Sequence, residues 1–143
     1  LEELESKLAE KNEALKAKNP EYAAEAQYVL AEIAFNSGKI EESEKMIHQI
    51  NANPSSEYWL AKTFVLWADI FKSKGNTIQA KQTLQSIIDN YEGDEELIEL
   101  AKQKLISLTD EETKALQETE DKRQEHQEAV DEIIIEDAEQ QNQ

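Results

Sequence analysis

Apolar side chains recur with helical spacing along the first 108 residues of the chain. Leu1, Leu4, Leu8 and Leu15 mark one face of a first segment, and similar spacings follow in later segments. Turn residues separate the segments at Asn19-Pro20, Gly38, Asn53-Pro54, Gly75-Asn76 and Gly93-Asp94. The pattern predicts six helices, at residues 1–18, 20–37, 40–51, 56–74, 78–91 and 95–108.

The chain repeats its own pattern after 37 residues, the distance from Gly38 to Gly75. Other pairs that match at this offset are Ala31 and Ala68, Glu32 and Asp69, Ile33 and Ile70, Ile47 and Leu84, and Ile50 and Ile87. A self-match with a period between about 20 and 50 residues is typical of proteins built from stacked repeat units. Because Gly readily ends a helix, Gly38 and Gly75 are predicted to close one helix and lead into the next.

Composition supports an all-α fold and excludes several functions. The 143 residues include only three Gly and two Pro, and they include no Cys, so neither a disulfide nor a thiolate metal site can form. The formal net charge is −17. Such an acidic surface repels phosphate groups, so we expect no nucleic acid or anionic membrane surface as a partner. No run of about 18 apolar residues occurs, so no membrane insertion is expected.

No set of residues predicts catalysis. His48 is expected to point to solvent because Ile47 and Ile50 form the apolar side of its segment, and His126 lies in a charged stretch. The Ser55-Ser56 pair has no base near it in sequence and is interpreted as a helix cap. The chain has no glycine-rich phosphate loop and no set of His residues or carboxylates with metal-ligand spacing. We therefore predict a protein that is not an enzyme and holds no metal or cofactor.

Each unit places large and small residues on its first helix, a Gly at the turn, and small and large residues on its second helix. These residues are Gln27, Leu30, Ala31, Gly38, Ser43, Ile47 and Ile50, and then Phe64, Trp67, Ala68, Gly75, Ala80, Leu84 and Ile87. The pattern resembles the tetratricopeptide repeat, although Gln27 replaces an aromatic residue and the period exceeds the usual value of about 34. The resemblance implies an α-solenoid of antiparallel helix pairs, about six to seven helices in all. Leu30 and Trp67 are expected to fill the core around the small residues.

More narrowly, residues 19–45 and 58–96 resemble the last repeats of large tetratricopeptide proteins of Bacteroidetes-type bacteria. Those proteins are typically exported and lie in the cell envelope. The resemblance implies that the chain is a C-terminal fragment of a larger protein. It favours the periplasm or cell envelope as the compartment, and the cytoplasm stays open as the alternative.

A solenoid of helix pairs exposes one face of the first helix of each unit on its concave side. The resemblance implies that a protein or peptide partner binds this face, which comprises Glu25, Tyr28, Glu32, Phe35, Asn36, Lys62, Val65, Asp69, Lys72 and Ser73. For Tyr28 and Phe35, packing against the leading helix is the alternative to exposure on this face. Tyr58 and Trp59 are expected to seal the gap between the two units.

The predicted organisation places two repeat units between a leading helix and an acidic tail. The segments are a leading helix at residues 1–19, repeat units at 20–54 and 55–93, a following or capping helix at 94–108, and the tail at 109–143. The predicted function is a non-catalytic protein-binding scaffold. The alternative is an architectural module that associates with itself through the leading helix or the tail.

The tail gives two conflicting signals. It holds 13 acidic residues and 3 basic ones, which argues for a mobile segment. Thr109 and Glu112 nevertheless have the spacing of a capping box for a seventh helix. Val130, Ile133 and Ile134 also have helical spacing, so a partly helical tail that docks on the concave face or on another molecule is the alternative.

Overall fold

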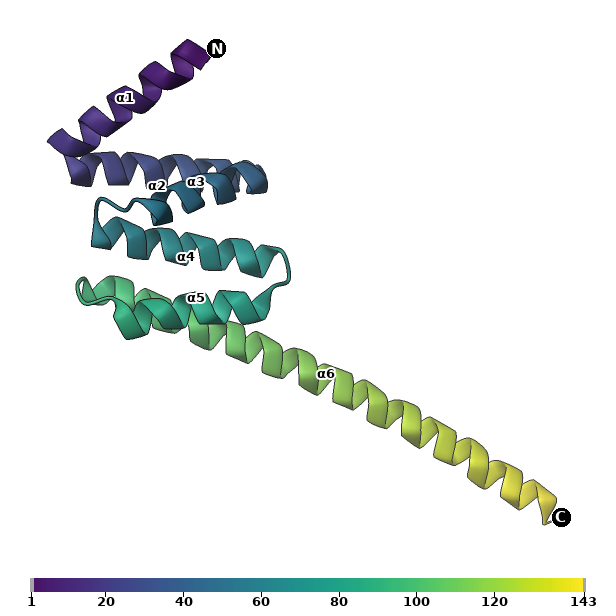
Figure 1. Ribbon diagram of the computed structural model, residues 1–143. Coiled ribbons are helices and arrows are strands. Elements are labelled where there is room, and N and C mark those ends of the chain that lie inside the picture. The colour runs from purple at the N-terminus through teal and green to yellow at the C-terminus, as the bar shows by residue number, and fades with distance from the viewer. Residues whose placement is uncertain (1, 143) are drawn as a thin grey trace. The chain divides into compact units, whose positions relative to one another are not determined.

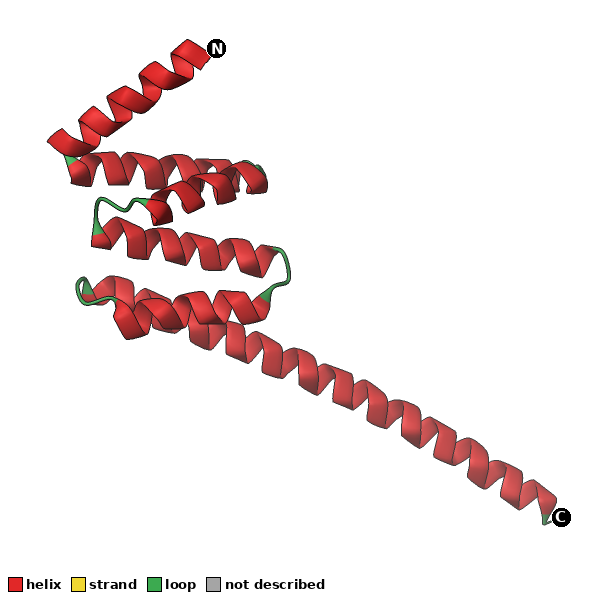
Figure 2. Ribbon diagram, in the orientation of Figure 1, coloured by secondary structure: helices red, strands yellow, loops and turns green. Residues whose placement is uncertain are grey.

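Six α-helices and no strand make up residues 2–142, which are the residues that the computed structural model describes, apart from the side chains of residues 12, 15 and 16 (Figures 1 and 2). The helices are α1 (Glu2–Lys18), α2 (Pro20–Asn36), α3 (Ile40–Ala52), α4 (Glu57–Ser73), α5 (Thr77–Asn90) and α6 (Glu95–Gln141). The all-α prediction is confirmed. Of the four leucines that marked the predicted leading face, Leu1 and the side chain of Leu15 lie outside the described residues.

The two glycine turns have the same geometry. Gly38 has a φ of 80° and Gly75 a φ of 77°, in the left-handed region that costs a Cβ-bearing residue energy. After α2, the N–H of Lys39 donates to the carbonyl of Ala34 at 2.8 Å. After α4, the N–H of Asn76 donates to the carbonyl of Phe71, also at 2.8 Å. These 6→1 bonds define a Schellman motif, so glycine ends both helices as predicted.

Each glycine turn joins two helices that pack against each other, α2 with α3 and α4 with α5. Four of the matched positions of the sequence repeat are buried in both pairs. In the first pair they are Ala31, Ser43, Ile47 and Ile50, and in the second Ala68, Ala80, Leu84 and Ile87, each at most 4% exposed. Small residues let the helix backbones approach closely, and the larger aliphatic side chains fill the layer beside them.

A shared apolar cluster joins the two helix pairs, since α4 contacts both α2 and α3. Its buried members are Tyr28, Ala31, Ile47, Leu66 and Ile70. Trp59 packs against this cluster from the start of α4, as expected of a residue that seals the gap between the units. Full burial of an Ile or Leu side chain stabilises the fold by roughly 1.5–3 kcal/mol, so this cluster holds the two pairs together.

Side-chain caps fix the first turns of two helices. The hydroxyl oxygen of Ser56 accepts the N–H of Trp59 at 3.3 Å, which confirms the predicted cap of α4. Asp94 caps α6, because its Oδ1 accepts the N–H of Leu97 at 2.9 Å. Each cap satisfies a backbone donor that the helix itself leaves without a partner.

Leu30 does not fill the core, and this part of the prediction is wrong. Its side chain is 57% exposed, and the nearby Ile33 is 54% exposed. The helix that could cover them, α1, meets α2 beside Asn19 and then leads away from it (Figure 1). The side of α2 that carries Leu30 is therefore open to solvent.

The chain divides into two compact units, one ending at Leu105 and the other beginning at Ile106, and each is described by itself. The second unit is helical from Ile106 to Gln141. Docking of the tail on the concave face or on another molecule stays a prediction. No new helix begins at Thr109, and the predicted capping box is wrong. Thr109 lies inside α6, where its carbonyl oxygen accepts the hydroxyl of Thr113 at 3.0 Å. The helix formers around it continue the helix, so no backbone donors are left there for a cap.

Candidate protein-binding face

The ten residues predicted for a binding face come from two neighbouring helices, α2 and α4, which contact each other. The structure exposes four of them, half-buries four and buries two. In that order they are Glu25, Asn36, Lys72 and Ser73; Glu32, Phe35, Lys62 and Asp69; and Tyr28 and Val65. The two predicted sets therefore share one side of the first compact unit, but not every member is accessible.

Tyr28 and Val65 are too deeply buried to contact a partner directly. Tyr28 is 8% exposed and Val65 is 6% exposed. Tyr28 does not lie on the leading helix either, because its ring packs against Trp59 of α4 with the centroids 5.4 Å apart. Both alternatives stated for Tyr28 are thus wrong, and it belongs to the cluster between the helix pairs. Phe35 is half-buried against the same cluster.

Lys62 is surrounded by three aromatic rings at the centre of this face. Its Nζ lies 5.5 Å from the ring centroid of Trp59, 5.7 Å from that of Tyr28 and 6.0 Å from that of Tyr58. A cation over a ring face is attracted by about 0.5–2 kcal/mol, depending on how much water is excluded. Three such contacts hold the ammonium group at one place between α2 and α4.

Tyr28 also supports a carboxylate on this face. Its hydroxyl donates a 2.6 Å hydrogen bond to Oε2 of Glu32, one helical turn further along α2. Burial of the phenol raises the pKa of Tyr28 well above its usual value, and the bond to Glu32 raises it further. The phenol therefore stays protonated and keeps the Glu32 carboxylate in a fixed position beside the aromatic rings.

Lys104, which the sequence reasoning missed, completes the charged groups. Its Nζ lies 3.0 Å from Oδ1 and 3.2 Å from Oδ2 of Asp69, so α6 is tied to α4. The 37-residue repeat could not reveal this pair, because Lys104 lies on a helix outside the two matched units. The face thus carries fixed charges of both signs, Lys62 and Lys104 beside Glu32 and Asp69.

A second feature missed from sequence is a groove along α4 and α5. One hollow of about 320 Å³ is lined by Phe64, Trp67, Phe71, Gln79, Gln82, Thr83 and Ser86. A second hollow of about 400 Å³ shares Phe64 and Ser86 and extends toward Glu57 and Tyr91. The spacing of Phe64, Trp67 and Phe71 places them on one side of α4, where the sequence pattern predicts only that Trp67 fills the core. Trp67 and Phe71 stack with centroids 5.5 Å apart and are half-buried.

The residues considered for catalysis do not converge on one another. His48 is exposed on α3, and its ring meets Trp67 edge-on at 5.1 Å. Ser56 donates its hydroxyl to Glu21 at 3.0 Å and caps α4 at the same time. Over residues 2–142, no group of three or more His, Cys, Asp or Glu side chains is placed to hold a metal ion. In the same range, no helix is long and apolar enough to cross a membrane.

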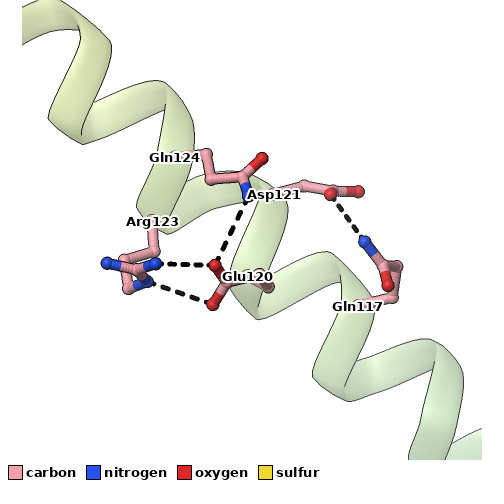
Figure 3. Close-up of polar contacts among 5 residues, drawn as sticks. All are labelled: Gln117, Glu120, Asp121, Arg123 and Gln124. Carbon is pink, nitrogen blue, oxygen red and sulfur yellow. Dashed lines mark hydrogen bonds and ion pairs between the residues drawn. The ribbon is translucent and has the colours of Figure 1, made fainter.

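A group of polar contacts in the second unit joins residues of the same helix (Figure 3). Arg123 donates to both carboxylate oxygens of Glu120, at 2.7 and 3.0 Å, and this bond lowers the pKa of Glu120. Gln117 donates to Asp121 at 2.9 Å, and Gln124 also approaches Glu120. All these pairs lie three or four residues apart, the spacing that stabilises a helix by itself. They hold the helix and do not form a pocket for a ligand.

Comparison with known proteins adds no family to this description. No family model matches the chain, and no curated protein or solved structure matches it. The resemblance to the tetratricopeptide repeat stays a prediction, argued from the residues of this chain.

Proposed function

We propose that this chain is a non-catalytic protein-binding scaffold, an α-solenoid of two antiparallel helix pairs similar to tetratricopeptide repeats. The observation that carries the proposal is the equivalence of the two pairs. Their turns share a left-handed glycine and a Schellman motif, and four matched positions are buried in each. Units of this kind stack side by side and display a continuous surface built from their first helices.

The surface of α2 and α4 is suited to a peptide that carries charged and apolar groups. The half-buried rings of Tyr58 and Trp59 beside Lys62 supply rigid contact area at a low cost in conformational entropy. Lys62, Glu32 and Asp69 are held by neighbouring side chains, so little further ordering is needed when a partner binds. Charges of both signs would fix the direction of a bound peptide.

A displayed peptide library, selected on the whole chain, tests this proposal. Binding of the selected peptides should weaken at least about tenfold in Lys62→Glu, because the change reverses a charge at the centre of the face. Lys45→Glu is the matched control. Lys45 is exposed on α3, so this substitution changes the net charge by the same amount outside the binding face. Far-UV circular dichroism and thermal unfolding of both variants check that they fold. Peptides that bind both variants equally, or the absence of any selected peptide, would contradict the proposal.

A further inference from the structure

A groove lined by aromatic rings runs along the α4–α5 pair, and the proposed function does not use it. We call it the α4–α5 groove, and it consists of the two hollows that meet at Phe64 and Ser86. The rings of Phe64, Trp67 and Phe71 are half-buried, and Trp67 stacks on Phe71 and meets Phe64 edge-on. At a rise of about 1.5 Å per residue, the side of α4 from Glu57 to Phe71 is about 20 Å long. Roughly six residues of an extended peptide, at about 3.3 Å each, cover that length.

The side chains that give this groove its character occur only in the second helix pair. They are three aromatic rings, Phe64, Trp67 and Phe71, and two carboxylates, Glu57 and Glu92. The positions 37 residues earlier have neither a ring nor a carboxylate, and they are Gln27, Leu30, Ala34, Pro20 and Ser55. The first pair has the same glycine turn and the same four buried positions without them. The packing of a helix pair therefore does not require these side chains.

One end of the α4–α5 groove is negatively charged. Glu57 and Glu92 are exposed and line the hollow at this end, and no Lys, Arg or His is among the described residues that line either hollow. Residues 82–101, which include this end, hold six acidic residues and no basic one. A cation placed here would therefore meet carboxylates without a competing cation from the lining of the groove.

The end of α5 adds to this negative charge. The helix ends at Asn90, beside Glu92, and it has no basic residue in its last turn. The carbonyl groups at a helix C-terminus carry a partial negative charge, which a cation stabilises. Glu57 lies in the first turn of α4, where the partial positive charge of that helix offsets part of its own. Glu92 and the end of α5 therefore attract a cation most strongly.

Tyr91 fixes the geometry at this end. Its hydroxyl oxygen accepts the N–H of Asp94 at 3.0 Å, so the residue after α5 is tied to the cap of α6. Its ring is half-buried and lines the hollow together with Glu92. A tyrosine ring can contact both an apolar group and a cation. Little ordering is therefore needed when a side chain that carries both kinds of group, such as Lys or Arg, enters this end.

We propose that the α4–α5 groove binds a peptide segment of a partner protein in which apolar side chains adjoin Lys or Arg. The apolar side chains lie on the rings of Phe64, Trp67 and Phe71, and the cation lies beside Glu92 and Glu57. The net charge of −17 attracts such a segment before contact. The groove shares no residue with the ten residues of the predicted binding face, so this inference goes beyond the proposed function and does not depend on it.

A random displayed peptide library, selected on the whole chain at about 0.15 M salt, tests the proposal. Peptides that bind the groove should bind Ser86→Lys at least about tenfold more weakly, because Ser86 lines both hollows and the new side chain fills the groove and repels a cation. The sequences of these peptides should combine apolar residues with Lys or Arg. Gln85→Lys is the matched control, since Gln85 is the exposed neighbour of Ser86 on α5 and does not line either hollow. Far-UV circular dichroism and thermal unfolding check that both variants fold.

Glu92→Gln tests the contribution of charge separately, at an exposed position where the substitution leaves the core unchanged. Binding of a selected peptide should weaken about two- to fivefold, the effect of losing one exposed charge pair. The same peptide with Gln in place of its Lys and Arg should bind Glu92→Gln and the wild type equally well. Glu41→Gln is the matched control, because Glu41 is exposed on α3, and it should leave binding unchanged.

Three results would overturn the proposal. The first is a selection that yields no peptide sensitive to Ser86→Lys. The second is a sensitive class of peptides without Lys or Arg. The third is equal weakening by Ser86→Lys and Gln85→Lys, which would show that the net charge of the chain alone attracts the peptides. Peptides weakened by Lys62→Glu and not by Ser86→Lys report on the proposed function, so the two proposals can fail separately.

Discussion

The hydroxyl of Ser43 donates a 2.7 Å hydrogen bond to the backbone carbonyl oxygen of Ala31, across the contact between α3 and α2. Ser43 is completely buried, and a buried hydroxyl without a partner costs about 1–3 kcal/mol. The equivalent residue of the second pair is Ala80, which has no hydroxyl, and the equivalent of Ala31 is Ala68. The first helix pair therefore has a side-chain hydrogen bond at this position, and the second pair has a methyl group there.

Ala80→Ser tests whether the two pairs are equivalent in detail. If the backbones match, the new hydroxyl reaches the carbonyl of Ala68, and the free energy of unfolding should change by no more than about 1 kcal/mol. Ser43→Ala should cost about 0.5–1.5 kcal/mol, because it removes one hydrogen bond without leaving a buried donor. Denaturant unfolding measures both. A loss of about 2–3 kcal/mol in Ala80→Ser would mean that the hydroxyl is buried without a partner and that the pairs differ.

Ile33 and Ile70 are equivalent in the repeat but opposite in environment. Ile70→Ala should destabilise the chain by about 2–5 kcal/mol, because Ile70 is completely buried and a cavity remains. Ile33→Ala should cost less than about 0.5 kcal/mol in the monomer, because Ile33 is mostly exposed. Thermal or urea unfolding at low protein concentration gives both values. Equal costs would show that Ile33 is covered within a single chain.

The glycine turns were predictable because their cause is local. A left-handed residue at a helix end excludes most side chains, so Gly38 and Gly75 are visible in the sequence itself. The burial of Ala31 and Ala68 was predictable for a related reason, since the same small residue recurs at the same place in both units. A small residue at one position has many explanations, but a small residue at the same position of both units predicts a close contact between helices.

The environment of Leu30 could not be predicted from the repeat. The equivalent Trp67 packs against the inter-pair cluster, but Leu30 has no helix on its side of α2. Burial depends on which neighbour covers a face, and the spacing of apolar residues does not encode the angle between α1 and α2 at Asn19. The pairing of Asp69 with Lys104 was hidden for a similar reason, since it joins residues 35 apart in different elements. The environments of Tyr28, Val65 and Asp69 in the predicted binding face likewise depend on contacts that only the folded chain contains.

Ionisation of Tyr28 should destabilise the folded chain at alkaline pH. Its pKa is raised in the folded state, mainly by burial and then by the bond to Glu32. The protonated phenol therefore contributes stability that is complete below the pKa of the unfolded chain, about 10, and is lost as pH rises toward the folded pKa. The free energy of unfolding of the wild-type chain should fall above about pH 10.

The comparison with Tyr28→Phe isolates this effect from other alkaline changes. The variant lacks the phenol, so its stability should fall less steeply than that of the wild type above about pH 10. In an ultraviolet absorbance titration, the variant should lack the tyrosine that ionises at the highest pH. Tyr22→Phe is the matched control, since Tyr22 is 70% exposed. A wild type and a Tyr28→Phe variant with the same slope would show that the phenol is accessible to solvent.

The helix from Ile106 to Gln141 is subject to two opposing electrostatic effects. Local pairs stabilise it, such as the bond from Gln127 to Asp131 at 3.0 Å and the ion pair between Arg123 and Glu120. Pairs at this spacing each stabilise an exposed helix only slightly. Like charges at four-residue spacing, such as Glu128 and Glu132, cost similar amounts. Repulsion should dominate, because the segment has 13 acidic residues and only 3 basic ones.

Salt should therefore stabilise this helix. Exposed charges interact over about 10 Å at 0.1 M salt and over a much shorter range at 1 M. Salt weakens both attraction and repulsion, so the net effect is to reduce the repulsion that dominates here. Hydrogen exchange of the backbone amides of residues 120–140 should slow as salt is raised. Glu132→Gln should slow exchange at low salt and weaken the salt response, because it removes a repulsive charge. Glu120→Gln, the matched control, should speed exchange, because it removes the partner of Arg123. Faster exchange at high salt would contradict this account and would show that the attractive pairs hold the helix.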